Sequence, residues 1–293
     1  MAGLAIATIA AAACTGPAAS PTPAPTATPV NIPAVVCVGE ATTYLDFLNG
    51  EFLPDTADPA PAPGDPATDL LALVQAAGVL RVSTDKDYAP QSYQEPDGSF
   101  VGFDIDVAKE IAERLGVTAE FQHVDWDLIT AGSWAGRWDI SVGSMTITTP
   151  RKEILSFTQP YYYTPAYLAA STRSGITSLD QLPFEIPADV TATTLPTDAN
   201  CIEQIAAGRP EFDLLITSGT VIDEAIDSDQ PIVKIGEPIY TEDLAVAIDK
   251  SGPHHEMLLA EIDRIIGEMH IDGTLTALSN QWFEEDLTQE PGG

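Results

Sequence analysis

The sequence is poor in basic residues. Twelve lysines and arginines stand against 44 aspartates and glutamates in 293 residues, which gives a formal net charge of −32. Nucleic acid and anionic membrane surfaces would be repelled by this charge, so we expect neither as a partner. The charge is typical of a solvated acidic surface suited to high salt. A hydrophobic content of 44% still allows one large core or two smaller ones.

Cysteines and catalytic motifs are also scarce. The three cysteines, Cys14, Cys37 and Cys201, have neither a zinc-site spacing nor a Cys-x-x-Cys arrangement. The sequence contains no phosphate-binding glycine-rich loop, no His-Glu-x-x-His and no Gly-x-Ser-x-Gly. Its four histidines form no metal-ligand spacing. We therefore expect no metal, no cofactor and no enzymatic activity.

The N-terminal region has the composition of a processing signal. Small and apolar residues fill 3–13 and end at Cys14. This run is too short to span a bilayer but suits the apolar part of a secretory signal. The Ala-Ala-Ala-Cys junction resembles a bacterial lipoprotein box, which implies that 1–14 is a signal segment and that Cys14 carries a lipid. No lysine or arginine precedes the run, so plain secretion stays an alternative.

We expect the protein to lie outside the cytoplasm, lipid-anchored or periplasmic, with the lipid as its sole membrane contact. Residues 15–69 are rich in proline and alanine and predict a tether, because such a composition buries little apolar surface. Within the tether, 35–53 is apolar enough to form a small element docked on the main body. Exported cysteines usually pair, so we expect a Cys37–Cys201 disulfide; two separate buried thiols are the alternative.

From residue 70 onward, helical and strand periodicities alternate. We expect helices over 70–78, 102–116 and 128–137, and strands over 79–84, 118–124 and 138–143. Asp104 would cap the second helix and Gly116 would end it. This alternation of strands and helices predicts a parallel α/β sheet.

Three loops leave the carboxyl ends of these strands and should meet at one edge of the sheet. They carry Asp85 and Tyr88, then Trp126, then Gly143, Ser144, Thr146 and Arg151. Hydroxyls, glycine backbone and a guanidinium all donate hydrogen bonds, and an arginine can pair a carboxylate through two parallel bonds. Each residue alone has a structural alternative: a packing aromatic, a surface ion pair, or a turn cap for Asp85. Their convergence predicts a socket for an amino-acid-sized carboxylate.

Several stretches carry a family resemblance. VLRVSTDKDYAP, GFDIDVAKEIAERLG and SVGSMTITTPRKEILSFTQPYYYT, with LAVAIDKSGPHHEMLLAEIDRIIGEMHIDGTLTALSNQWF, resemble the family 3 extracellular solute-binding proteins, the amino-acid receptors of bacterial ABC importers. The resemblance covers about 70–283. It implies an α/β, two-lobe periplasmic-binding-protein fold of type II, with the lobes joined by a two-strand hinge. We expect lobe 1 over 70–168 plus 240–287 and lobe 2 over 169–239, with crossings near 167–171 and 237–246.

The resemblance also implies roles for single residues. The ligand carboxylate would be bound by Arg151 and Thr146, with backbone near Gly143 and Ser144. Tyr88 and Trp126 match aromatic positions that cover the ligand side chain, and Asp85 matches a polar position at the end of the pocket. Pro150 would begin a helix capped by Thr149, with its N-terminus directed at the same region.

The second lobe departs from the family pattern. After SLDQL at 178–182, the Gly-Thr-Thr stretch of the family is absent, and Ser218 stands where an aspartate usually binds the ligand ammonium. Asp85, Asp223 or Glu224 could hold the ammonium instead, or the ligand could be a carboxylate without an amine.

We expect a monomeric solute-binding protein that captures a small carboxylate ligand, above all a polar amino acid, and delivers it to an ABC transporter permease. Two alternatives stay open: a ligand-sensing receptor module that signals through a partner, and a dehydratase-type enzyme on the same fold. The sequence leaves the ligand side chain undecided.

Overall fold

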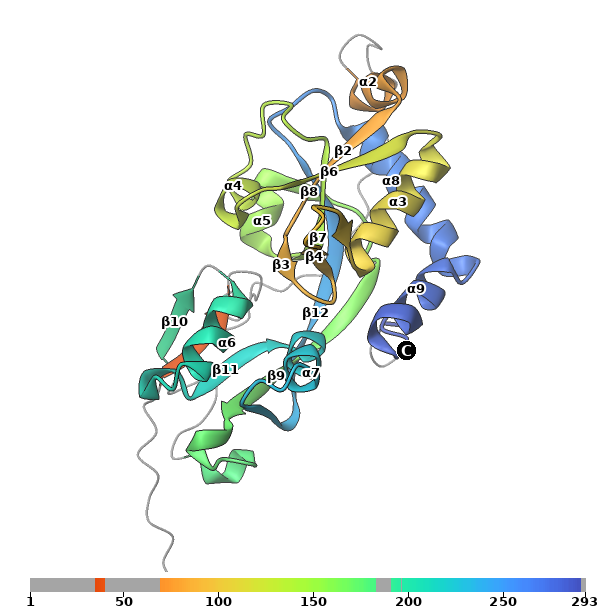
Figure 1. Cartoon of the computed structure of the whole chain (residues 1–293). Helices are drawn as coiled ribbons and strands as arrows, with labels where there is room; N and C mark the ends of the chain where they lie inside the picture. The colour runs from red at the N-terminus through yellow and green to blue at the C-terminus, as the bar shows by residue number, and fades with distance from the viewer. Residues whose placement is uncertain (1–34, 40–68, 183–190, 196, 291–293) are drawn as a thin grey trace, which may run out of the picture. The chain divides into compact units, whose positions relative to one another are not determined.

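The computed structural model describes residues 35–39, 69–182, 191–195 and 197–290 (Figure 1). The predicted signal segment, Cys14 and most of the predicted tether lie outside these ranges. Within the ranges, no helix is long and apolar enough to cross a membrane.

One large sheet runs through the described chain. Its strands are β1 (Val35–Gly39), β2 (Val79–Thr84), β6 (Thr118–His123), β7 (Ile140–Thr146), β8 (Leu155–Phe157), β9 (Tyr162–Ser171), β10 (Thr191–Leu195), β11 (Leu214–Ser218) and β12 (Ile232–Asp249). Their order is β10-β1-β11-β9-β12-β7-β2-β6, and β8 pairs with β12. A small second sheet holds β3 (Asp87–Tyr88), β4 (Ser92–Gln94) and β5 (Phe100–Val101).

Helices connect these strands. They are α2 (Leu70–Ala77), α3 (Phe103–Leu115), α4 (Trp126–Thr130), α5 (Thr149–Ile154), α6 (Asp198–Ala206), α7 (Gly219–Asp227), α8 (Glu256–Ile271) and α9 (Thr274–Phe283). Short 3-10 turns are η1 (Thr172–Ser174), η2 (Leu179–Gln181) and η3 (Pro210–Phe212).

The predicted parallel arrangement is confirmed where it was expected. β2 pairs in parallel with β6 on one side and with β7 on the other. β12 runs antiparallel to β7, β8 and β9, so the whole sheet is mixed.

The sheet carries separate hydrophobic cores toward its two ends. We call lobe 1 the part built on β2, β6, β7 and β8, with helices α2 to α5, α8 and α9. Lobe 2 is the part built on β1, β10 and β11, with α6 and α7. The antiparallel strands β9 and β12 run through both lobes (Figure 1). They form the two-strand hinge.

The cores show where the hinge strands change lobes. On β9, Tyr162 belongs to the lobe 1 core and Ala166 to a lobe 2 core. On β12, Tyr240 belongs to lobe 2 and Leu244 to lobe 1. The change on β9 thus comes slightly before the expected crossing at 167–171. The predicted lobe bounds also did not assign β1 to lobe 2.

The C-terminal helix α8 contributes a fully buried face, as its apolar spacing predicted. That face consists of Leu258, Ile262, Ile265, Ile266 and Met269, none of them exposed to solvent. It packs in the lobe 1 core.

Helix α3 ends as predicted and begins differently. Gly116 adopts a left-handed conformation at the C-cap, which confirms the predicted end. The N-cap is Gly102, at φ 131°, where an added Cβ would lie 2.2 Å from the Gln91 carbonyl oxygen. The prediction that Asp104 caps this helix was therefore wrong. Asp104 is the second residue of the helix, and its side chain is buried.

Two further local predictions are corrected. The segment predicted as helical over 128–137 is helical only through Thr130, because Gly132, Ser133, Ala135 and Gly136 take positive φ angles that a right-handed helix excludes. The cap of α5 is Thr148, whose hydroxyl accepts from the Arg151 N–H at 3.4 Å, and Thr149 is the first helical residue.

Candidate ligand-binding site

Arg151 lies where β7 ends and α5 begins, at the carboxyl edge of the lobe 1 strands. Its Nη1 donates to the Thr146 carbonyl oxygen at 3.0 Å. Its Cζ lies 5.2 Å from the ring centroid of Trp126, so the guanidinium contacts the indole face. The two predicted residues are thereby brought together. A guanidinium oriented by an aromatic face and a carbonyl presents its remaining N–H groups in a defined plane.

A buried carboxyl group is bonded to the same threonine. Thr146 Oγ1 donates to Glu242 Oε1 at 3.0 Å, and both side chains are almost fully buried. Glu242 belongs to the hinge strand β12. The site thus combines one cationic and one acidic group within the reach of a single threonine.

Tyr88 lies close to two acidic side chains. It is buried, and burial raises the pKa of its phenol well above the ordinary value; the charges of Asp198 and Glu242 raise it further. The phenol therefore keeps its proton and can donate a hydrogen bond. Asp198, also buried, is the first residue of α6 in lobe 2.

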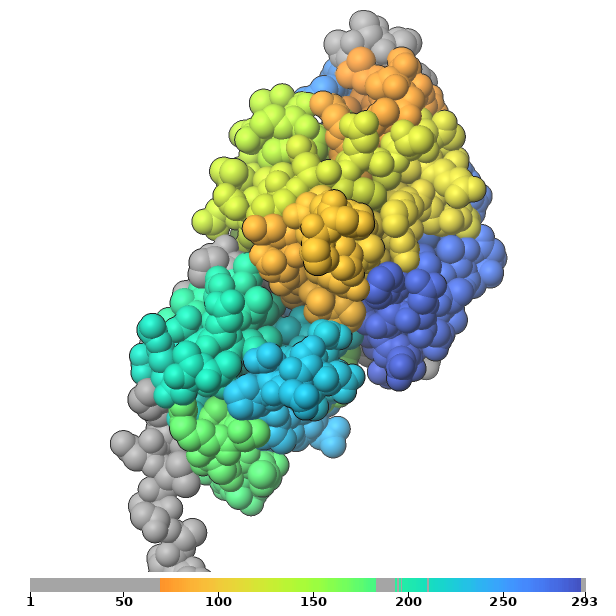
Figure 2. Space-filling view, viewed as in Figure 1, coloured from red at the N-terminus to blue at the C-terminus, as the bar shows by residue number. Residues whose placement is uncertain are grey.

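A hollow of about 240 Å³ is lined by Tyr88 from lobe 1 and by Asp198 and other residues of α6 and α7 from lobe 2. Figure 2 shows the orange atoms of the β3–β4 region beside the teal atoms of α6 on this face. Both lobes contribute polar groups to this hollow, and its lining contains none of Arg151, Trp126, Thr146 and Glu242.

Ser144 has polar partners inside lobe 1. Its N–H donates to the Tyr161 hydroxyl at 3.0 Å and its Oγ donates to Asp104 Oδ2 at 2.8 Å. The hydroxyls of Tyr162 and Tyr161 donate to Ser144 Oγ and Asp104 Oδ1, both at 2.7 Å. Burial raises the pKa of Asp104 to about 7, opposed by the bonds from Tyr161 and Ser144. The predicted contact of Ser144 with a ligand stays a prediction, and its hydrogen-bonding groups are used in this network.

Asp85 follows its structural alternative. Its Oδ1 accepts from the N–H groups of Lys86 at 2.6 Å and Asp87 at 3.0 Å, which forms a local turn. His123 Nδ1 lies 4.0 Å from the same oxygen. Gly143 is an interior residue of β7 beside the Thr84–Asp85 backbone. Ligand contacts of Asp85 and Gly143 stay predictions.

Ser218 lies at the carboxyl end of β11 in a chain of hydroxyl groups. Its Oγ is 3.2 Å from Thr164 Oγ1 and 2.6 Å from Thr220 Oγ1. Gln91 Nε2 of lobe 1 donates to Thr220 Oγ1 at 2.6 Å, which makes a hydrogen bond between the lobes. Ser218 therefore takes part in holding the lobes together in this conformation.

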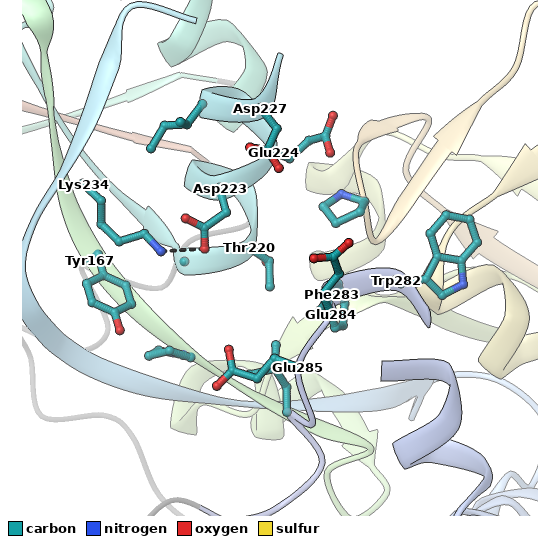
Figure 3. Close-up of a pocket in the computed structure, with 15 residues that line it drawn as sticks. Tyr167, Thr220, Asp223, Glu224, Asp227, Lys234, Trp282, Phe283, Glu284 and Glu285 are labelled. Carbon is teal, nitrogen blue, oxygen red and sulfur yellow. Dashed lines mark hydrogen bonds and ion pairs between the residues drawn. The ribbon is translucent and has the colours of Figure 1, made fainter. Parts of the chain in front are cut away.

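The two other acidic candidates, Asp223 and Glu224, line a second hollow, of about 500 Å³ (Figure 3), and Glu224 also lines the first. Asp223 Oδ2 pairs with Lys234 Nζ at 2.5 Å, and Glu224 lies one residue further along α7. Glu284 and Glu285 approach the same hollow from the end of α9 (Figure 3). This lining contains neither Arg151 nor Trp126.

Glu242 and Asp198 were not among the site residues predicted from the sequence. Glu242 could have been noticed as one of two adjacent acids, with Asp243, directly before the apolar stretch LAVAI, and Asp198 as an acid in the first turn of a helix after Thr197. Neither signal shows that the side chain is buried. Among the described residues, no group of three or more His, Cys, Asp or Glu is arranged to hold a metal ion.

Comparisons with known proteins indicate the family of this chain. Residues 80–285 match the family model of the bacterial extracellular solute-binding proteins, family 3. The L-cystine-binding protein TcyJ of Escherichia coli (strain K12) is 27% identical over 238 residues, covering 75% of this chain and 88% of that protein.

Solved structures show the same fold. The ancestral amino acid-binding protein AncCDT-1, a precursor of cyclohexadienyl dehydratase, is 28% identical with a TM-score of 0.63, covering 73% of this chain and 99% of that one. A histidine-bound substrate-binding protein of an ABC uptake transporter from Streptococcus pneumoniae has a TM-score of 0.64 at 20% identity, covering 76% and 100%.

Proposed function

The chain belongs to the bacterial extracellular solute-binding proteins of family 3, and we propose that it captures a small carboxylate ligand, first of all a polar amino acid, and delivers it to an ABC transporter. Its fold is the two-lobe, type II periplasmic-binding-protein fold with a two-strand hinge. The family and its amino-acid-binding and cystine-binding relatives support this function.

One observation carries the choice of ligand. The Arg151 guanidinium, held over Trp126, and the Glu242 carboxyl are both bonded to Thr146, the guanidinium to its carbonyl and the carboxyl to its hydroxyl. An amino acid has a carboxylate and an ammonium on one carbon atom. Arg151 would pair with the ligand carboxylate, and Glu242 takes the role that Ser218 cannot take, as the anionic partner of the ammonium.

Asp198 and Tyr88 support a polar ligand side chain. They lie on opposite lobes at one hollow, where each offers a polar group, and the charge of Glu242 acts on the Tyr88 phenol by raising its pKa, after burial and the charge of Asp198. A ligand held between them would contact both lobes at once, which favours the closed arrangement by its differential affinity.

The proposal includes a place and a partner. The protein would act outside the cytoplasm as a monomer, with a lipid on Cys14 as its membrane attachment, and would hand its ligand to the permease without a cofactor. In cells supplied with a fatty acid that carries an alkyne label, the wild type should incorporate the label and Cys14→Ala should not. Equal labelling of the two proteins, or none in either, would contradict the lipid anchor and leave ligand capture unaffected.

A thermal-shift screen tests ligand capture. The probes are the standard amino acids, L-cystine and matched carboxylates that lack the amine. A compound present at 100 times its dissociation constant adds about 2.7 kcal/mol to the free energy of unfolding, which is a readily measured shift. A shift with amino acids that is absent in Arg151→Ala supports the proposal. No shift with any probe contradicts it and favours a receptor module without this ligand class.

We propose that the chain is not an enzyme, although one similar structure is described as the precursor of a dehydratase. That precursor is itself an amino acid-binding protein by its description. Conversion of a cyclohexadienyl carboxylic acid to an aromatic product, measured as a gain of ultraviolet absorbance, would overturn this part of the proposal.

A further inference from the structure

We infer that the N-terminal strand β1 is an integral strand of lobe 2, and that the ligand-facing edge of this lobe forms only when β1 is in place. The statement about the ligand-facing edge rests on the proposed function. The statement that β1 is an integral strand of lobe 2 does not depend on it. The sequence predicted only a small element at 35–53 docked on the main body. In the sheet order, the strand β1 at 35–39 lies inside the sheet, between β10 and β11.

β1 lies inside the sheet and has a neighbour on each side. It pairs in parallel with β10 along its whole length, with Gly39 opposite Leu195. On the other side it pairs in parallel with β11, with Val38 opposite Ile216. An interior strand uses backbone N–H and C=O groups on both of its sides. β1 is therefore not a strand added to an existing edge, which would be paired on one side only.

Lobe 2 depends on this position. In the described order β10-β1-β11, β10 reaches the rest of the sheet through β1. Helix α6 packs against β1, and its buried residues Cys201 and Ile205 share a core with Leu215 of β11. Without β1, β10 would lose its parallel partner and α6 would lose one of the strands against which it packs. Residues of α6 line the hollow that also contains Tyr88.

The strand order also places the end of β1 at the site. β10, β1 and β11 are parallel, so their carboxyl ends lie at one edge of the sheet. The chain after β10 leads to Asp198, and β11 ends at Ser218. Gly39 ends β1 between them. Displacing β1 would therefore move Asp198 away from Tyr88, to which its charge is coupled in this conformation.

A covalent link supports the same arrangement. Cys201 of α6 is disulfide-bonded. The only other cysteines of the sequence are Cys14 and Cys37. Whichever of them is the partner, the bond ties α6 to the segment that contains or precedes β1. A cross-link of this kind opposes separation of the strand from the lobe by restricting the unfolded chain.

Hydrogen exchange on the full-length wild-type protein is the first test. Backbone amides of β1 should exchange as slowly as those of β10 and β11, because all are bonded within one sheet. The same amides in the urea-denatured protein provide the reference for fast exchange. Fast exchange throughout 35–39, at the rate of that reference, would overturn the inference without any substitution.

Val38→Pro is the second test, because proline lacks the N–H that an interior strand needs. Peptides from β10, β11 and α6 should lose protection by at least about tenfold, while β2 and β6 in lobe 1 stay protected. Thr28→Pro, in the proline-rich part of the chain, is the matched control, and Val38→Ile should behave as the wild type. Equal protection of lobe 2 in Val38→Pro and Thr28→Pro would overturn the inference.

Calorimetric titration with L-arginine, L-histidine and L-cystine tests the ligand-facing edge. Any of these probes that binds the wild type should bind Val38→Pro at least about tenfold more weakly than it binds Thr28→Pro. Equal affinity of the two variants, together with lost protection in Val38→Pro, would overturn the statement that the ligand-facing edge needs β1. If neither these probes nor any compound of the thermal-shift screen binds the wild type, the amino-acid proposal fails, and the exchange result still decides the position of β1.

Discussion

Thr146 and Glu242 are 96 residues apart in the chain and share a hydrogen bond of 3.0 Å inside the protein. Thr146 ends β7 of lobe 1, and Glu242 belongs to the hinge strand β12, so the bond joins the ligand edge of lobe 1 to the hinge. Ligand binding that changes the surroundings of the Glu242 carboxyl would therefore act directly on a strand of the hinge.

Glu242→Gln should separate ammonium recognition from carboxylate recognition. The amide keeps an acceptor for Thr146 but removes the negative charge, so the affinity for an amino acid should fall by about tenfold or more, as for loss of a hydrogen bond to a charged group. Affinity for the matching carboxylate without an amine should change little. Equal losses for both compounds in calorimetric titration would show that Glu242 does not bind the ammonium.

Arg151→Ala should weaken binding of the screened amino acid by about 2 to 5 kcal/mol, because a desolvated partner of the ligand carboxylate is removed. Arg151→Lys should restore little, since lysine lacks the planar fork that lies over Trp126. Trp126→Ala should cost less than Arg151→Ala. The control is Arg264→Ala, which removes an exposed arginine paired with Glu261. Unchanged affinity in Arg151→Ala would show that the ligand carboxylate does not bind at Arg151.

Asp104 should make the free energy of unfolding depend on pH. Its folded-state pKa is raised by burial from 3.8 to about 7, so the folded protein holds a proton that the unfolded chain has released between these values. Stability from this group therefore falls as pH rises through that window, by at most about 1.4 kcal/mol per pH unit, and is constant above it.

Asp104→Asn isolates this effect, because the amide does not titrate and all other carboxyl groups are the same in the two proteins. Relative to Asp104→Asn, the wild type should lose stability in urea unfolding between about pH 4 and pH 7. Parallel curves for the two proteins over this range would show that the carboxyl does not carry a raised pKa.

The partner of Cys201 should be Cys37, which lies on the strand that α6 packs against. Peptide mapping under non-reducing conditions should give one cross-linked species that contains both residues. Cys37→Ser should then leave Cys201 as a thiol open to alkylation after denaturation. A cross-link to Cys14, or two free thiols in the wild type, would refute this pairing.

Salt should stabilise the fold. The formal net charge of −32 leaves many carboxylates repelling one another, and added ions screen this repulsion. The melting temperature should rise between dilute buffer and molar sodium chloride. A melting temperature that stays constant or falls would mean that the local ion pairs, such as Arg114 with Glu110 and Asp272, outweigh the overall repulsion.

Local patterns were sufficient for much of lobe 1. The apolar spacing of α8 determines which face is buried, because a helix places residues three and four apart on one side. Gly116 determines the end of α3, because glycine takes the left-handed conformation without a steric penalty. The alternation of strands and helices was enough to predict the parallel β6-β2-β7 arrangement and the edge that carries Trp126 and Arg151.

Only the tertiary structure decided which polar groups are buried together at the candidate site. Local sequence does not show that Asp104, Glu242 and Asp198 are buried, because burial depends on elements far away in the chain. It also does not show which strands become neighbours: β1 lies between β10 and β11, more than 150 residues further on, because backbone hydrogen bonds between strands depend on tertiary contacts and not on adjacent residues. The sequence determined the elements and their chemistry; strand order and burial decided which of them form the site.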